Sequence, residues 1–164
     1  MRILGIDPGL GRLGWGAIEV LGGKQRAIEY GCIETSQQLL EEERLKQVFD
    51  ELTEMIKKTQ PEALALEELF FSKNVTTAFM VGQARGVVLL LAAQHNLPVH
   101  AYNPGEVKVA VTGYGKADKK QIGQMVKVIL KLEKLPRLDD TTDALAIALT
   151  HAFTGKMSSK TGKK

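Results

Sequence analysis

The chain has 164 residues, 44% of them hydrophobic and 25% charged, which is typical of one globular domain with a single core. We expect no apolar stretch that reaches the roughly 18 to 20 residues of a membrane span, and Asp7 interrupts the segment where a signal peptide is apolar. A single cysteine, Cys32, excludes an internal disulfide and a cysteine-based zinc cluster, so we expect a cytoplasmic protein.

The first part of the chain predicts an antiparallel meander. Strand-like runs separated by glycine-rich turns cover residues 2–7, 12–20 and 26–35. Residues 41–60 then carry apolar side chains at helical spacing, with acids concentrated at the start as the helix dipole favours. Consecutive strands with short connections pair antiparallel, so these three strands form one half of a sheet.

The following segments alternate between strand and helix. They are a strand at 63–67, a helix at 75–95 and a strand at 99–102. This order implies two parallel crossovers, so the prediction is an α/β fold with a five-stranded mixed sheet flanked by helices. Further helices are expected near residues 104–111, 118–132 and 140–153. The predicted domain covers residues 1–153, and residues 154–164 are predicted to be a basic, disordered tail.

Positive charge is concentrated in two segments. The net charge is +3, but the tail holds four lysines and no acid, which leaves the rest of the chain at −1. Between residues 105 and 137, eight basic residues outnumber three acids; the basic residues are Lys108, Lys116, Lys119, Lys120, Lys127, Lys131, Lys134 and Arg137. This basic block is suited to contact with phosphates, and the alternative is a solvated, lysine-rich helix face.

Four carboxylates occupy positions that suit a metal site. Asp7 and Glu67 each end an apolar run, and Asp140 and Asp143 lie three residues apart on one face of a predicted helix. A charge that leaves water must be paired or must hold a metal, and hard divalent cations prefer carboxylate oxygens. Two such ions about 4 Å apart share several carboxylates and act on phosphoryl displacement.

Each acid taken alone also has an ordinary explanation. Asp7 precedes Pro8 and Gly9, a common turn opening, and Asp140 resembles a helix N-cap with an acid at its third position. Only Glu67 has no capping role, because it follows an apolar strand. The combination of all four therefore indicates a catalytic site.

Several ordered motifs run along the chain to about residue 153. They are Gly5-Ile6-Asp7-Pro8-Gly9, Glu67-Glu68-Leu69-Phe70, Lys73-Asn74 with Gly82-Gln83-Ala84-Arg85-Gly86, and Asp140-Thr141-Thr142-Asp143-Ala144-Leu145-Ala146. Together they resemble the RuvC Holliday-junction resolvases, which belong to the RNase H-like superfamily. The resemblance implies an RNase H-like fold, a catalytic tetrad of Asp7, Glu67, Asp140 and Asp143, and two Mg²⁺ ions per active site, with Mn²⁺ as a substitute. Some members have histidine where this chain has Asp140, so an all-oxygen site is expected here.

The resemblance further implies a homodimer that nicks symmetrically placed strands of a four-way DNA junction in recombination and repair. It also implies the branch-migration proteins RuvA and RuvB as partners. The residues alone indicate hydrolysis of a phosphodiester but not a junction, so two alternatives remain: a nuclease for another branched DNA or structured RNA, and a non-catalytic junction-binding module. An actin-like nucleotide-binding half is disfavoured, because the chain has no room for a second lobe.

Basic residues matching the family supply candidate DNA contacts. Lys108 and Lys119 match positions where the family keeps basic residues near the scissile phosphate, and Lys116 lies close to them in the sequence. A lysine there neutralises phosphate charge as a compact point charge. Arg85, between two glycines of a predicted helix, is expected either to reach the DNA backbone or to form a surface salt bridge.

Aromatic residues and glycines add further candidates. Phe70 is either a core residue or, as the resemblance implies, a wedge against an opened base, and Lys73 follows it as a DNA contact. Tyr114, in the basic block, either touches DNA or belongs to a flexible surface loop. Gly82 and Gly86 leave one helix face without side chains, for contact with either the sheet or a second subunit.

Overall fold

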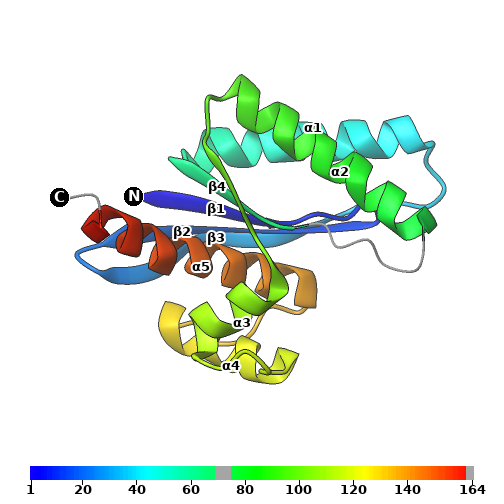
Figure 1. Ribbon diagram of the computed structural model, residues 1–164. Coiled ribbons are helices and arrows are strands. Elements are labelled where there is room, and N and C mark those ends of the chain that lie inside the picture. The colour runs from blue at the N-terminus through cyan, green and yellow to red at the C-terminus, as the bar shows by residue number, and fades with distance from the viewer. Residues whose placement is uncertain (69–74, 162–164) are drawn as a thin grey trace.

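The computed structural model describes residues 1–68 and 75–161. A five-stranded sheet with the strand order β3-β2-β1-β4-β5 forms the middle layer, with helices on both faces (Figure 1). The strands are β1 (Arg2–Asp7), β2 (Arg12–Leu21), β3 (Lys24–Glu34), β4 (Ala63–Glu67) and β5 (Val99–Tyr102). The helices are α1 (Glu41–Thr59), α2 (Val75–Gln94), α3 (Pro104–Thr112), α4 (Lys119–Leu130) and α5 (Asp139–Thr161).

Strand pairing confirms the predicted mixed sheet. β2 pairs antiparallel with both β1 and β3, whereas β4 pairs parallel with β1 and β5. The turn between β2 and β3 contains Gly22 and Gly23, both with positive φ, a conformation that side chains disfavour. The short turn explains the antiparallel half, and helices α1 and α2 provide the crossovers of the parallel half.

Alternate residues of β1 and β4 feed two cores, one on each face of the sheet. Leu4 and Leu64 pack with α1 and α2, and the contacting helix residues include Val48, Leu52 and Val88. On the opposite face, Ile3 and Ala65 pack with a core that includes residues of α3, α4 and α5. Figure 1 shows these layers, with α1 and α2 above the sheet and α5 below it. The period of two along the strands therefore sets which face each helix covers.

Glycines let helix α5 approach the sheet backbone closely. A Cβ atom added at Gly14 of β2 would lie 1.9 Å from the carbonyl oxygen of Asp140, and one added at Gly5 of β1 would lie 2.1 Å from that of Ala144. No side chain fits at such distances, because a Cβ there would overlap the helix backbone. The two glycines therefore fix how deeply α5 sits on β1 and β2, and with it the position of its acidic first turn.

Helix α5 is longer than the sequence suggested. The expected end was near residue 153, but the helix continues to Thr161. Residues 162–164 lie outside the described part of the chain, and the disorder of residues 154–164 stays a prediction. Treating residues 1–153 as the nuclease domain stays a prediction.

Helix α2 corrects a second expectation. Its segment Thr76–Gln94 is long and apolar enough to cross a membrane by length and composition, with a mean hydropathy of 1.4, although no such stretch was expected. One face of the same helix, which includes Ala84, Val88 and Leu91, is buried. Its apolar character therefore reflects both a core face and an exposed apolar face.

Candidate active site

The sheet brings Asp7 and Glu67 to the same edge. β1 and β4 run parallel with Ile6 beside Leu66, so the acids that end the two strands are neighbours. β2 then supplies Gly14 opposite Asp7. Because Gly14 touches the backbone of Asp140, the start of α5 lies directly over this edge. Strand order and one close helix contact thus gather residues that are far apart in the sequence.

The first turns of α5 complete the cluster. The helix begins at Asp139, so Asp140 lies inside its first turn and is not the N-cap residue, which removes the capping alternative. Asp143 follows on the same face and lines a cavity of about 210 Å³ together with Glu67. The four predicted catalytic acids are therefore brought to one end of the molecule.

Burial and the neighbouring carboxylates raise the pKa values of Asp7 and Glu67. Burial and, to a smaller extent, the neighbouring carboxylates of Glu67, Asp143 and Asp140 raise the pKa of Asp7 from 3.8 to about 7, and Lys119 partly offsets this. The pKa of Glu67 is also raised, first by burial and then by Asp143. Ionising these acids together is unfavourable without a neighbouring cation, and such electrostatics are typical of a cation-binding site.

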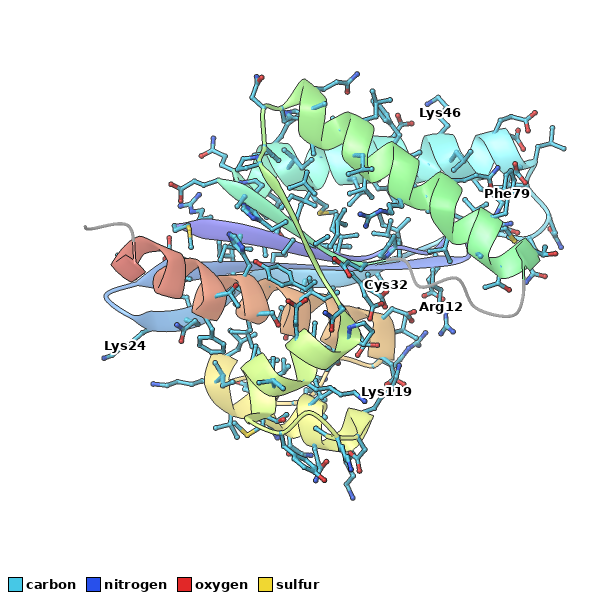
Figure 2. The ribbon with its side chains drawn as sticks, in the orientation of Figure 1. Arg12, Lys24, Cys32, Lys46, Phe79 and Lys119 are labelled. Carbon is cyan, nitrogen blue, oxygen red and sulfur yellow. The ribbon has the colours of Figure 1, made fainter. Side chains whose placement is uncertain are left out.

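Two exposed cations pair with the acids of α5. The Lys119 Nζ atom donates a hydrogen bond to Asp143 Oδ2 at 3.0 Å, and Arg12 Nε lies 3.6 Å from Asp140 Oδ2. Figure 2 shows Arg12 and Lys119 at the same end of the sheet. Both cationic side chains are more than half exposed, at 54% and 71%. Exposed ion pairs contribute little free energy, so both cations can exchange partners at little cost.

The other predicted DNA contacts have different positions. Lys108 lines the same cavity as Glu67, beside Lys119, as the sequence suggested. Lys116 is exposed in the connection between α3 and α4. Phe70 and Lys73 lie outside the described residues, so their predicted contacts stay predictions.

Arg85 stabilises the backbone at the end of β4. Its Nη1 atom donates a hydrogen bond to the carbonyl oxygen of Glu67 at 2.9 Å, and this contact holds the end of β4. Sequence reasoning missed this role, since Arg85 lies 18 residues away in the chain. It also missed Arg12 as the partner of Asp140, although Arg12 opens the strand that pairs with Asp7. A DNA contact by Arg85 stays a prediction.

The donor set fits a hard divalent cation. Over residues 1–68 and 75–161, no three His, Cys, Asp or Glu side chains are close enough to enclose one ion, so the acids form an open cluster and not a closed cage. Mg²⁺ is commonly held by one or two carboxylates together with substrate phosphates and waters, and it does not need a cage made only of protein. The open cluster of oxygen ligands therefore fits a divalent cation that is also bound by groups from outside the protein.

The raised pKa of Asp7 predicts how stability depends on pH without metal. Unfolded Asp7 loses its proton near pH 3.8, while the folded residue keeps it to about pH 7. The folded state thus binds more protons between these values, so this residue lowers the free energy of unfolding as pH rises through the interval. In chelator, Asp7→Asn should be more stable than wild type at pH 8, by up to about 4 kcal/mol, and nearly equal to it near pH 4.

Urea unfolding of both proteins at the two pH values measures this difference. Comparing the variant with wild type at each pH cancels the titration of groups shared by both. An equal stability difference at pH 4 and pH 8 would show that Asp7 is not held in a repulsive environment.

Comparison with known proteins identifies the family. The sequence profile of crossover junction endodeoxyribonuclease RuvC matches residues 3–151. Proteins of that name from Alkaliphilus metalliredigens and Desulfitobacterium hafniense are 49% and 51% identical to the chain, and the alignments cover 97% and 99% of it and 97% and 98% of the relatives.

The fold gives the same result. The structure of Thermus thermophilus RuvC in complex with a Holliday junction substrate matches with a TM-score of 0.92 and 42% identity, over 96% of both chains. This similarity confirms the RNase H-like α/β fold that the motifs implied. The chain belongs to the RuvC family of crossover junction endodeoxyribonucleases.

Proposed function

We propose that this protein is a structure-specific, metal-dependent endonuclease that resolves four-way DNA junctions in recombination and repair. Family membership and the similarity to a relative bound to a Holliday junction support this activity. The observation that carries the proposal is the convergence of Asp7, Glu67, Asp140 and Asp143 at one sheet edge, with Lys108 and Lys119 beside them.

The residues that would hold Mg²⁺ are these four acids, with two ions per site and Mn²⁺ as a substitute. When bound, such ions activate water and stabilise the leaving oxygen of an in-line displacement. Asp7 is the central ligand, because it interacts electrostatically with all three other acids. Hydrolysis consumes one water, breaks the bond between phosphorus and the 3′ oxygen, and leaves 5′-phosphate and 3′-hydroxyl ends.

Two lysines prepare the site for the phosphate. Lys119 holds Asp143 in the absence of DNA, and Lys108 lines the same cavity. Once an anionic phosphodiester enters, Lys119 is expected to leave Asp143 and neutralise the phosphate. An ammonium at this position counters charge that builds up on the phosphate oxygens during displacement.

An exposed apolar face of α2 supports the proposed homodimer. Phe79 and Leu90 of this helix are 64% and 52% exposed. Nothing lies within 4 Å of a Cβ added at Gly82 or Gly86, so these glycines do not contact the sheet and are open to a second backbone. A contiguous apolar face with small residues is a typical subunit interface. Two subunits give two active sites, as symmetric nicking of a junction requires.

The homodimer predicts a specific effect of charge on this face. Phe79→Glu should convert a dimer into a monomer in sedimentation velocity, because a carboxylate cannot be buried unpaired at the interface. Leu21→Glu is the matched control, since Leu21 is 74% exposed at the end of β2, away from α2. If Phe79→Glu sediments as wild type does, α2 is not the interface.

Two further proposals concern the cellular setting. We place the enzyme in the cytoplasm, where its substrate DNA is, and we propose RuvA and RuvB as partners that move the junction to the cutting site. A pull-down of this protein on immobilised junctions, with and without RuvA and RuvB, tests the second proposal. Retention of this protein that does not change with either partner would contradict it.

One gel separates the candidate activities. A labelled four-way junction and a linear duplex of the same sequence are each incubated with Mg²⁺ and with chelator. Paired symmetric nicks in the junction alone, and only with Mg²⁺, are the expected result. Cutting of a flap or a structured RNA in preference to the junction would favour another RNase H-like nuclease, and binding without cutting would favour a non-catalytic module.

A further inference from the structure

A second cavity adjoins the active site. It has a volume of about 410 Å³ and lies between the end of α3 and the first turns of α4. Ala117 lines both this cavity and the one that contains Glu67 and Asp143, so the two are separated by a single chain segment. The volume is within the range of about 300–1,000 Å³ that is usual for ligand sites.

An aromatic ring held by its own backbone lines this cavity. The Tyr114 amide donates a hydrogen bond to Thr112 Oγ1 at 3.1 Å, and its carbonyl accepts one from the Ala117 amide at 3.1 Å. Gly113, with φ +74, makes the sharp turn that precedes it. Despite these constraints the side chain is 55% exposed. Because the backbone is already fixed and the ring is exposed, stacking of a flat ligand on the ring costs little conformational entropy.

Lysine side chains place positive charge at this cavity and beside it. Lys120 lines it, whereas the preceding residue, Lys119, points at Asp143 in the active-site cavity. Two consecutive lysines therefore face two adjoining cavities, and this arrangement offers positive charge to two phosphates of one strand. Lys116 adds a third exposed positive charge next to the tyrosine. An apolar peptide would gain nothing from these lysines, while a nucleic acid strand would.

We propose that this cavity binds one unstacked nucleobase of the strand that is cut, stacked on Tyr114 with its phosphate at Lys120. The remaining walls suit such an occupant: Met125 offers a flexible apolar surface, and Gln124 offers an amide for the base edge. Stacking on an aromatic side chain is tolerant of sequence and strong enough to hold a base out of the duplex. This inference rests on the proposed function, because the strand is the one that enters the active site.

The test uses junctions in which single nucleotides near the cut are made abasic. Affinity is measured by fluorescence anisotropy in chelator, so that cleavage does not interfere. Wild type should bind one of these junctions about tenfold more weakly than the intact junction, since the stacked base is missing. Tyr114→Ala should bind the intact junction and this abasic junction with equal affinity. Tyr114→Phe, which keeps the ring, should restore the tenfold difference.

Val128→Ala is the matched control, because Val128 is a 66% exposed apolar residue of α4 that does not line the cavity. It should retain the wild-type pattern. The inference is overturned if no abasic position weakens wild-type binding, or if Tyr114→Ala shows the same loss as wild type. Failure of the proposed function looks different: the intact junction would then bind no more tightly than a linear duplex.

Discussion

Asp7→Asn is expected to abolish junction cleavage while leaving junction binding within a few-fold of wild type. Asp7 interacts with each of the other three acids, so its loss removes the centre of the proposed metal site. The substitution keeps the size and polarity of the side chain but removes the charge that attracts a divalent cation. Single-turnover cleavage should fall by about a thousandfold or more.

Binding should survive because the residues proposed to contact the DNA backbone remain in place. Lys108 and Lys119 are unchanged in the variant, and removing one negative charge lowers the repulsion of phosphate. Asp50→Asn is the matched control: it makes the same chemical change at an exposed position of α1 that pairs with Lys46. Cleavage by Asp7→Asn within tenfold of wild type would refute the assignment of the site.

Gly14→Ala is expected to damage both stability and cleavage. The added methyl would lie 1.9 Å from the Asp140 carbonyl oxygen and 2.2 Å from its carbon, and these are backbone atoms that no rotamer change can move. Helix α5 must then lift from β2, at a cost of about 3 kcal/mol or more in the free energy of unfolding. Because α5 carries Asp140 and Asp143, the same shift separates them from Asp7.

Gly11→Ala provides the comparison, since its added methyl would meet only Arg44 Nη2 at an ordinary 3.6 Å. This control should unfold in urea and cleave junctions much as wild type does. Thermal or urea unfolding together with single-turnover cleavage measures both effects. Wild-type stability and activity in Gly14→Ala would mean that α5 is not held by this close contact.

The sheet and its topology were predictable because their signals are local. Alternating or continuous apolar runs mark strands, glycine-rich turns mark the meander, and the intervening helices force the parallel half. The acids at the strand ends were also visible, since Asp7 and Glu67 follow apolar residues directly. Strand order then determines that the two lie side by side.

The remaining features depend on contacts between distant residues. Nothing near Gly14 in the sequence shows that it faces the backbone of Asp140. The contacts of Arg12 with Asp140 and of Arg85 with the Glu67 carbonyl likewise arise only when strand and helix meet. The expected end of the last helix was near residue 153, but helix α5 continues through residue 161. Local propensity is a weak guide where tertiary packing has already nucleated the helix.

Anomalous scattering from Mn²⁺, in crystals grown with a junction whose scissile linkage resists cleavage, tests most directly whether the four acids act as one metal site. We predict two manganese peaks about 4 Å apart, with Asp7 bound to both ions. Glu67, Asp140 and Asp143 should each bind one of the two ions through a carboxylate oxygen. Manganese that binds elsewhere, or that leaves Asp7 uncoordinated, would contradict the account.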